Sequence, residues 1–278
     1  MLSYRHSFHA GNFADILKHI VLVEALGHFA KKESAFEYVD SHAGAGLFNL
    51  ASKDAKKLEE HNHGISKLVA SDFPELLDFF TAIRAYNKSA KINFYPGSPA
   101  IAKHFLRKQD RAWLYELHPQ DYKSLCKNVE SSKKMRVSSQ DGLKALESVL
   151  PPTSRRGLIL IDPSYEIKSE YEHVFRACVN AYKKFSTGTY IVWYPVVERR
   201  QVDVMEKKLI LSGIKNIQRF ELGQSADTRE RGMTSSGVFV INPPWTLFQK
   251  MSAVLPRLAT ILGDKNDGFF KCDILVAE

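Results

Sequence analysis

The sequence predicts an α/β protein built on a mostly parallel β-sheet. Residues Leu158 to Ile161 are four consecutive aliphatic residues, typical of a strand that is buried on both faces. Predicted strands and helices alternate along most of the chain, which favours a sheet with helices on both sides. Several of these strands end at acids or glycines, where an open α/β sheet binds its ligands.

Composition favours a globular protein with a basic surface. The chain has 278 residues and is 44% hydrophobic, enough for one elaborated α/β domain. It has no apolar run of membrane-spanning length and no signal-peptide pattern, so we expect a soluble, cytoplasmic protein without a membrane partner. The net charge of +8 favours a polyanionic partner such as nucleic acid, although a solvated basic surface would carry the same charge.

The cysteines indicate neither a disulfide framework nor a metal site. Cys126, Cys178 and Cys272 are isolated from one another and are not spaced as metal ligands, so we expect reduced thiols. We also expect a monomer that needs no metal.

The strand at 158–161 leads directly into Asp162-Pro163-Ser164-Tyr165. Proline stiffens this turn, and its carbonyl oxygen beside the Asp162 carboxylate would give two adjacent acceptors for an NH₂ group. Tyr165 offers a flat face for a base, a contact worth about 1–3 kcal/mol. The alternative is an ordinary turn in which Asp162 caps the next helix.

An earlier predicted strand, residues 35–40, also ends in an acid and leads into glycines. Asp40 closes it, and the following turn contains His42, Gly44 and Gly46. Glycines here would let the backbone approach a nucleotide closely. A tight loop without a ligand fits the same pattern, with His42 as a hydrogen-bonded loop residue.

A long insertion separates these glycines from the next strand. In a nucleotide-binding βαβ unit, the acid that binds the ribose follows the glycines by about 20 residues. Here the next predicted strand ends at Glu116, 70 residues beyond Gly46 (116 − 46). We therefore expect residues 47–95 to form a small helical insertion subdomain, and residues 1–46 and 96–278 to form the main domain with its N-terminal motif.

The insertion is lysine-rich and is expected to be helical at 53–60, 64–70 and 73–86. Its lysines suit the backbone of a nucleic acid, although a solvated helical surface explains them equally well. The string Pro96-Gly97-Ser98-Pro99 returns the chain to the main fold, where a helix is expected at 100–107.

A third acid ends the strand predicted at about 133–140, where Asp141 is followed by Gly142. This acid is a candidate for contact with a cofactor. It is also a candidate N-cap for the helix that follows, and both roles are compatible.

The first twelve residues are rich in Tyr, Arg and His and include Tyr4 and His6. A helix is expected from Phe13, with Lys18 and His19 off its apolar stripe or at its edge. One interpretation is a disordered basic tail. The other is a segment that folds over a bound cofactor or base.

The remainder of the chain continues as α/β. Helices are expected at 169–185, 200–211 and 247–262, and strands at 188–195, 217–222 and 237–241. The last of these strands ends in a second motif-like string, Asn242-Pro243-Pro244-Trp245. Because this string closes a late strand far from the glycines, we interpret it as a structural turn.

Asp162-Pro163-Ser164-Tyr165 resembles the Asp/Asn-Pro-Pro-Tyr/Phe motif of amino-group methyltransferases that use S-adenosylmethionine. Ser164 replaces the usual second proline, which removes stiffness but keeps the Pro163 carbonyl, so it bears on turnover rather than on the chemistry. Together with the ordered acids and glycines at strand ends, the motif predicts a class I methyltransferase. That fold is Rossmann-like, with a mostly parallel seven-stranded sheet, helices on both faces and, here, the helical insertion.

Further strings resemble the ribosomal RNA large subunit methyltransferase J family over nearly the whole chain. They are Tyr4-Arg5-His6-Ser7-Phe8-His9-Ala10-Gly11-Asn12, the Asp40–Gly46 turn, Pro96–Pro99 and Glu116-Leu117-His118-Pro119. Members of that family methylate N6 of one adenine in 23S ribosomal RNA, and were earlier described as acting in catabolism of external DNA. The resemblance implies S-adenosylmethionine as cofactor and 23S ribosomal RNA as partner.

The motifs and the resemblance assign roles to residues of this chain. The expected cofactor contacts are His19, His42, Gly44, Gly46, Ser98, Glu116, Asp141, Gly142 and Asp162. The expected catalytic residues are Asp162, Pro163 and Tyr165, and the expected substrate contacts are Tyr4, His6, Lys18 and Tyr165.

The predicted reaction leaves other functions open. Asp162 and the Pro163 carbonyl would accept both hydrogens of an adenine amino group and aim its nitrogen at the methyl. DNA adenine or a protein glutamine amide are alternative acceptors, although the basic charge disfavours the amide. A third hypothesis is a non-catalytic nucleic-acid-binding protein with a vestigial cofactor fold.

Overall fold

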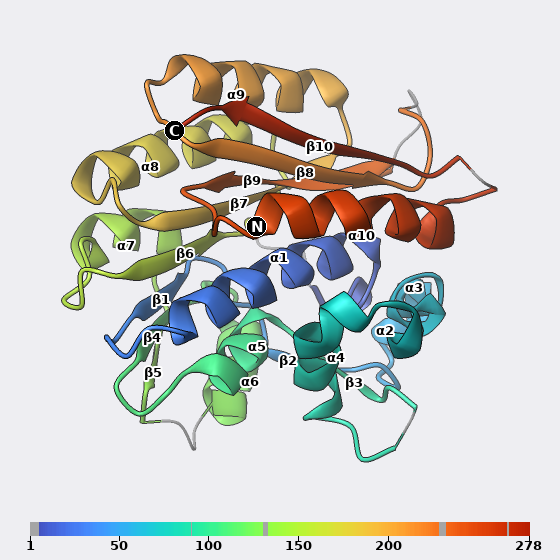
Figure 1. Ribbon diagram of the computed structural model, residues 1–278. Coiled ribbons are helices and arrows are strands. Elements are labelled where there is room, and N and C mark those ends of the chain that lie inside the picture. The colour runs from blue at the N-terminus through green and yellow to red at the C-terminus, as the bar shows by residue number, and fades with distance from the viewer. Residues whose placement is uncertain (1–5, 90, 130–132, 228–231, 266) are drawn as a thin grey trace.

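The computed structural model describes residues 6–89, 91–129, 133–227, 232–265 and 267–278, and its centre is one eight-stranded sheet (Figure 1). Its strands are β1 (Glu37–Asp40), β4 (Arg111–Tyr115), β5 (Met135–Ser138), β6 (Gly157–Ile161), β7 (Thr189–Val196), β8 (Ile217–Gly223), β9 (Ser235–Ile241) and β10 (Phe269–Val276). Their spatial order is β10-β8-β9-β7-β6-β1-β4-β5. The α/β class predicted from the sequence is confirmed.

In spatial order, β5, β4, β1, β6 and β7 are parallel neighbours. By contrast, β9, β8 and β10 join the sheet through antiparallel pairs. The expected count of seven strands is wrong, because β10 adds an eighth at the edge beside β8. This strand is only partly buried and carries Lys271 and Asp273. It therefore lacks the aliphatic run that makes β6 easy to recognise.

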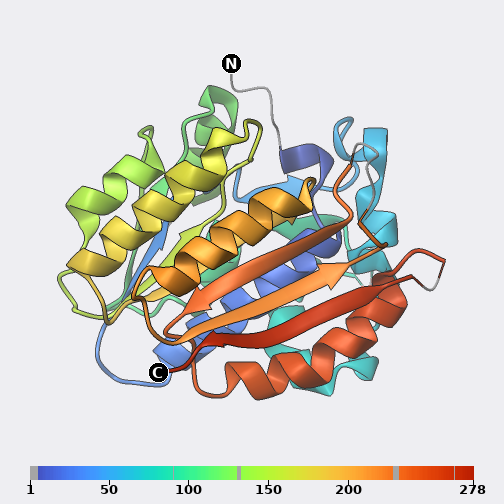
Figure 2. The same cartoon turned by 90° about the horizontal axis from the view of Figure 1, so that it is seen from above.

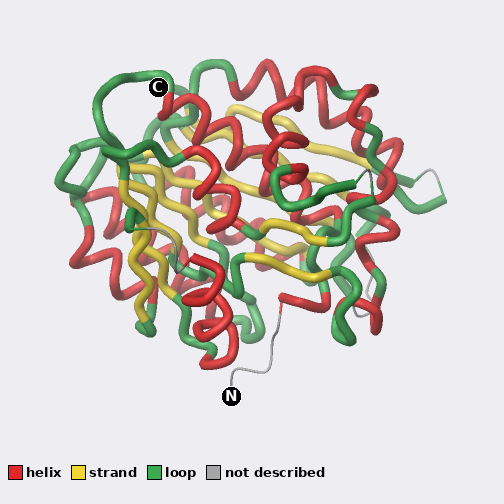
Figure 3. Tube along the Cα trace, turned by 90° about the horizontal axis from the view of Figure 1, so that it is seen from below, coloured by secondary structure: helices red, strands yellow, loops and turns green. Residues whose placement is uncertain are grey.

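Helices cover both faces of the sheet. One face carries α1 (Phe13–Ala30), α5 (Ser98–Phe105), α6 (Pro119–Val129) and α10 (Leu247–Leu262), and the other carries α7 (Gly142–Val149), α8 (Ser169–Lys184) and α9 (Arg199–Leu211). Figure 2 looks down on α8 and α9 with α1 beyond the strands, and Figure 3 shows the strands between helices from the opposite side.

The predicted burial of β6 on both faces is confirmed. Successive residues of a strand point to opposite sides of the sheet. Leu158 and Leu160 join the core beneath α1 and α10, whereas Ile159 and Ile161 join the core beneath α8 and α9. Since all four are fully buried, β6 is fixed firmly in the sheet, and so is the turn that follows it.

The first long helix, α1, is buried on nearly all sides. Asn12 caps it by accepting a hydrogen bond from the Asp15 backbone N–H at 3.0 Å. The helix packs against α5, α4 (Leu77–Arg84), α10 and the strands beneath it. Its polar residues Lys18 and His19 are therefore buried as well. In the portion of the chain described, no helix is long and apolar enough to cross a membrane.

Residues 47–95 are less regular than expected. Helices α2 (Ala55–Leu58), α3 (Glu60–His63) and α4 are short. Three consecutive 3₁₀ turns, at Ile65–Lys67, Ala70–Asp72 and Pro74–Leu76, lie between α3 and α4. The left-handed backbone of Glu59 ends α2 within the first predicted helix. Extended backbone at Leu68 interrupts the second. The segment also contains an unpredicted pair of strands, β2 (Leu47–Asn49) and β3 (Phe94–Pro96).

The apolar side chains of this segment, including Phe73, Phe79 and Tyr95, share one core with α1. Division of the chain into a main domain and an insertion subdomain stays a prediction.

The string Asn242-Pro243-Pro244-Trp245 is a structural turn, as interpreted from the sequence. Because β9 runs antiparallel to β7, it ends at the opposite edge of the sheet from β6. The side-chain amide of Asn242 donates to the carbonyls of Ser186 and Gly188, each at 2.8 Å. These bonds tie the end of β9 to the start of β7, far from the end of β6.

We expect Ile20→Ala to lower the free energy of unfolding by about 2–5 kcal/mol, because it leaves a cavity between α1 and the sheet. Ile20 is fully buried. Urea denaturation would measure the loss. Val204→Ala, at a side chain 45% exposed on α9, is the control and should change the value by less than about 0.5 kcal/mol. Equal effects of the two substitutions would contradict the central place of α1 in the core.

Candidate active site

Four acids meet at one edge of the sheet. The chain leaves β1 toward β4 and β5 on one side, while β6 lies on the other side of β1. An open α/β sheet binds ligands at such a reversal, beyond the carboxyl ends of the strands. Asp40 ends β1, and Glu116, Asp141 and Asp162 follow β4, β5 and β6. The convergence of strand-end acids follows directly from this topology.

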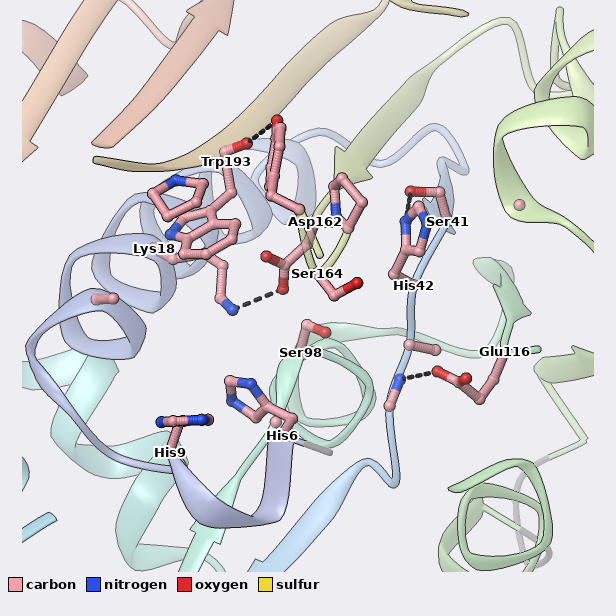
Figure 4. A pocket seen from close by; sticks show the side chains of 18 of the residues that line it. His6, His9, Lys18, Ser41, His42, Ser98, Glu116, Asp162, Ser164 and Trp193 are labelled. Carbon is pink, nitrogen blue, oxygen red and sulfur yellow. Dashed lines mark hydrogen bonds and ion pairs between the residues drawn. The ribbon is translucent and has the colours of Figure 1, made fainter. Parts of the chain in front are cut away.

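A cavity of about 420 Å³ opens at this edge (Figure 4). Its volume lies in the range of about 300–1,000 Å³ that is usual for small-molecule sites. The predicted site residues that line it are His6, Lys18, His19, His42, Gly44, Ser98, Glu116, Asp141, Gly142, Asp162, Pro163 and Tyr165. They come from seven separate segments of chain, and only folding brings them together.

Of the predicted site residues that the structure describes, Gly46 is not part of this lining. Gly46 has a left-handed backbone (φ +79°), and a Cβ there would lie 2.9 Å from Cδ1 of Leu125, so the turn and its packing require glycine. Tyr4 lies outside the described residues. Their expected contacts with cofactor and substrate stay predictions.

The centre of the cavity holds a buried cluster of one lysine and two aspartates. Lys18 Nζ lies 2.6 Å from Asp162 Oδ2 and 3.0 Å from Asp15 Oδ1, and Figure 4 shows Lys18 and Asp162 pointing toward each other. Lys18 also lies 5.5 Å from the centre of the Trp193 ring, a cation–π contact. Helix α8 begins at Ser169 after Lys168, so Asp162 does not cap it.

Charges in this cluster determine each other's protonation. Burial raises the pKa of Asp162 above its usual value, and the neighbouring Lys18 ammonium opposes that rise. Burial alone would lower the pKa of Lys18, but attraction to Asp162 and Asp15 outweighs it and raises the pKa. For Asp15, His6 and Lys18 outweigh burial and lower the pKa well below the usual range. Lys18 therefore stays charged.

Two histidines flank the cluster. His6 Nε2 lies 2.9 Å from Asp15 Oδ2, which connects the amino-terminal segment with α1. His19 lies one residue beyond Lys18, and its Nδ1 lies 2.9 Å from the Tyr95 hydroxyl. Burial lowers the pKa of His19 to about 3, so its ring is neutral.

The other end of the cavity presents acceptors and backbone turns. Glu116 accepts hydrogen bonds from the backbone N–H of Gly44 at 2.8 Å and of His118 at 2.6 Å, and its burial raises its pKa. Each carboxylate oxygen has two lone pairs, so Glu116 can still accept bonds from a ligand.

Asp141 caps α7 through Oδ1, which accepts from the backbone N–H groups of Leu143 and Lys144. The predicted capping role is confirmed, and Oδ2 lies on the side of the carboxylate not used by the cap. Gly142 packs directly on the end of β1, since a Cβ there would lie 1.9 Å from the Ser41 carbonyl oxygen. Only glycine allows this approach.

Asp40, at the end of β1, is fully buried and is not among the residues that line the cavity. Burial raises its pKa to about 6, although hydrogen bonds from Ser98 and Tyr38 counteract the rise. The Tyr38 hydroxyl donates to Asp40 Oδ2 at 2.7 Å. The neighbouring His42 bonds to the Ser41 hydroxyl, and burial lowers its pKa to about 4, so this ring is also neutral.

Tyr165 is held in a fixed position beside Asp162. Its hydroxyl donates to the Trp193 carbonyl at 2.7 Å, and its ring packs on Tyr171 and Trp193. The hydrogen bond joins the loop after β6 to β7. Tyr165 therefore lines the cavity as a rigid aromatic wall.

Sequence reasoning missed Asp15 and Trp193 as members of the site. Asp15 lies one helical turn before Lys18 in a helix that is otherwise largely apolar, and this unusual placement was a usable signal. Trp193 lay within a predicted strand, but nothing in the sequence indicated that its ring would face Lys18.

Comparisons with known proteins agree with this architecture. The family model for "Ribosomal RNA large subunit methyltransferase D, RlmJ" matches residues 33–276. Proteins named "Ribosomal RNA large subunit methyltransferase J" from Haemophilus influenzae and Escherichia coli are 44% and 45% identical, each over the full length of both chains.

A crystal structure of a Legionella pneumophila protein shares 38% sequence identity with this chain. It superimposes with a TM-score of 0.87 and covers 96% of this chain and 98% of the other. Sequence and structure therefore agree over nearly the whole length, and the chain belongs to the RlmJ family of ribosomal RNA large subunit methyltransferases.

Proposed function

We propose that this protein transfers a methyl group from S-adenosylmethionine to N6 of one adenine in large-subunit (23S) ribosomal RNA. The observation that carries the proposal is the position of Asp162 and Pro163 after β6, at the wall of a cavity lined by strand-end acids. Membership in the RlmJ family supports the ribosomal RNA substrate.

The residues at the Glu116 end of the cavity fit the cofactor. The Gly44 turn permits close approach of a ligand, Glu116 suits ribose hydroxyls, and Asp141 Oδ2 suits the adenine amino group. When bound, the cofactor supplies an electrophilic methyl group on a sulfonium. Among the described residues, the cavity wall contains seven Asp or Glu side chains but Lys18 as its one lysine or arginine, so it favours a positively charged donor.

Asp162 and Pro163 would orient the acceptor. An adenine amino group is a poor nucleophile because its lone pair is delocalised into the ring. Two acceptors that bind its hydrogens favour a pyramidal nitrogen, and alignment within about 3–3.5 Å can contribute roughly 7–11 kcal/mol. Asp162 needs no strong basicity, because the proton becomes acidic only after the methyl has been transferred.

Lys18 leaves one oxygen of Asp162 for this purpose. Its ammonium binds Oδ2 at 2.6 Å, so Oδ1 is the oxygen available to an amino hydrogen. The same ion pair opposes the tendency of burial to protonate Asp162. Tyr165, fixed by its bond to the Trp193 carbonyl, offers the face on which the base would stack.

The RNA must present its adenine outside the helical stack, which costs a few kcal/mol and is partly offset by stacking on Tyr165. A basic chain with a net charge of +8 suits this polyanion. Ribosomal RNA as substrate implies a cytoplasmic enzyme. We propose that it acts as a monomer.

The direct test is transfer of labelled methyl from S-adenosylmethionine to three acceptors: unmodified 23S ribosomal RNA, genomic DNA and a protein lysate. We expect N6-methyladenine in the RNA alone. Label in DNA or protein would overturn the substrate, and cofactor binding without transfer to any acceptor would indicate a non-catalytic binding protein.

We expect Asp162→Ala and Asp162→Asn to lower kcat by about 10²-fold or more, because each removes a charged acceptor that aligns the amino group. Asp203→Asn on the exposed side of α9 is the matched control and should leave kcat unchanged. Single-turnover transfer to RNA would measure both. Retention of near-normal kcat in Asp162→Ala would remove Asp162 from the reaction.

The pH profile should report the Lys18–Asp162 pair. Lys18 lowers the pKa of Asp162, so Lys18→Met should raise it and move the acidic limb of the kcat profile to higher pH. Lys207→Met, at an exposed lysine on α9, is the control and should leave the limb in place. A limb that stays fixed or moves to lower pH in Lys18→Met would contradict the role given to the pair.

A further inference from the structure

The amino-terminal segment, residues 6–12, rests on the insertion through the carboxylate of Glu60. Oε1 of Glu60 lies 2.9 Å from His9 Nδ1, and Oε2 accepts a hydrogen bond from the Asn12 side-chain amide at 2.9 Å. Both oxygens are thus engaged by the same short segment. Burial alone would raise the pKa of Glu60, but the bonds from His9 and Asn12 outweigh it and lower the pKa.

The backbones of the two segments also fit closely beside Glu60. The N–H of Ile65 donates to the Gly11 carbonyl at 2.8 Å. A Cβ on Gly64 would lie 2.1 Å from that carbonyl oxygen, so the contact requires glycine at this position. At the other end of the segment, the Ser7 hydroxyl donates to Asp54 at 2.9 Å. These contacts form a tightly packed interface within the chain.

The same short segment contacts the reaction centre from its other side. His6 lies 2.9 Å from Asp15, and Asn12 fixes the first turn of α1 through the Asp15 backbone N–H. Asp15 binds Lys18, and Lys18 binds Asp162. In Figure 4, His6 and His9 project from this segment at the side of the cavity opposite Glu116. An uninterrupted series of polar contacts therefore runs from Glu60 to Asp162.

We propose that the insertion supports the amino-terminal segment, and that Glu60 is a positioning residue that places His6 against Asp15. Glu60 is not among the residues that line the cavity, so it acts through the segment it holds. This role differs from a grip on the RNA backbone, since a carboxylate repels phosphates and both of its oxygens are engaged. The proposal deepens the proposed function and depends on it for the activity measurements.

The test is a double-mutant cycle with Glu60→Ala and His6→Ala. We expect Glu60→Ala to lower kcat on the order of tenfold, with little change in KM for the RNA. If Glu60 acts through His6, the double variant should be no slower than His6→Ala alone. Glu60→Gln should recover most of the loss, because its amide can still accept from Asn12 and donate to His9.

Glu75→Ala is the matched control. Glu75 also belongs to the insertion, is ion-paired with Arg257, and has a side-chain exposure of 26% against 33% for Glu60. It should leave kcat unchanged even where it lowers the melting temperature. Independent, multiplicative losses from Glu60→Ala and His6→Ala would overturn the proposal, as would an equal loss in Glu75→Ala.

A second measurement separates this proposal from the proposed function. The nitrogen-15 NMR signal of the His6 ring reports its bond to Asp15, and Glu60→Ala should shift it whereas Glu75→Ala should not. This readout needs no RNA. An unshifted His6 signal would overturn the positioning role even in an active enzyme. If Glu60→Ala shifts the His6 signal but the wild-type protein methylates no RNA, the substrate alone would be overturned.

Discussion

The ion pair between Lys18 and Asp162 connects two parts of the chain that are 144 residues apart, and the rest of the site is arranged around it. A buried charge without a partner is strongly destabilising, so each of these groups needs the other. The pair fixes α1 across the sheet at the level where β6 ends. It also decides which oxygen of Asp162 faces the cavity. The proposed catalytic carboxylate is therefore positioned by the amino-terminal helix as much as by its own strand.

Charge is distributed unevenly between the surface and the cavity. The chain has a net charge of +8, yet the described residues that line its cavity include more acids than lysines and arginines. A basic exterior suits a polyanionic RNA, and an acidic interior suits a cationic methyl donor. The parallel strands contribute to the acidic interior, because their carboxyl ends bring Glu116, Asp141 and Asp162 to one edge of the sheet. The two requirements are thus met by different parts of the structure.

The sequence identified residues 47–95 as an insertion but did not show what the insertion contacts. The 70-residue gap between Gly46 and Glu116 was enough to predict an insertion. Its lysines suggested contact with nucleic acid, but its best-defined polar contacts come from two acids, Asp54 and Glu60, which bind residues 7–12. Short helices and tight turns replaced the longer helices expected, and Gly64 packs closely on the backbone of Gly11. Propensity could not show that Gly64 is required by the backbone of Gly11.

The sequence by itself determined the α/β class, the buried β6 strand and the residues at most strand ends, because these depend on local patterns of apolar residues, glycine and proline. It also identified the family through motifs that span the chain. Only the tertiary structure decided that Asp15, Lys18 and Asp162 form one buried cluster, and that β10 completes the sheet. Such contacts join residues far apart in sequence, and they are fixed by how α1 packs on the sheet and by the need to pair charges excluded from water.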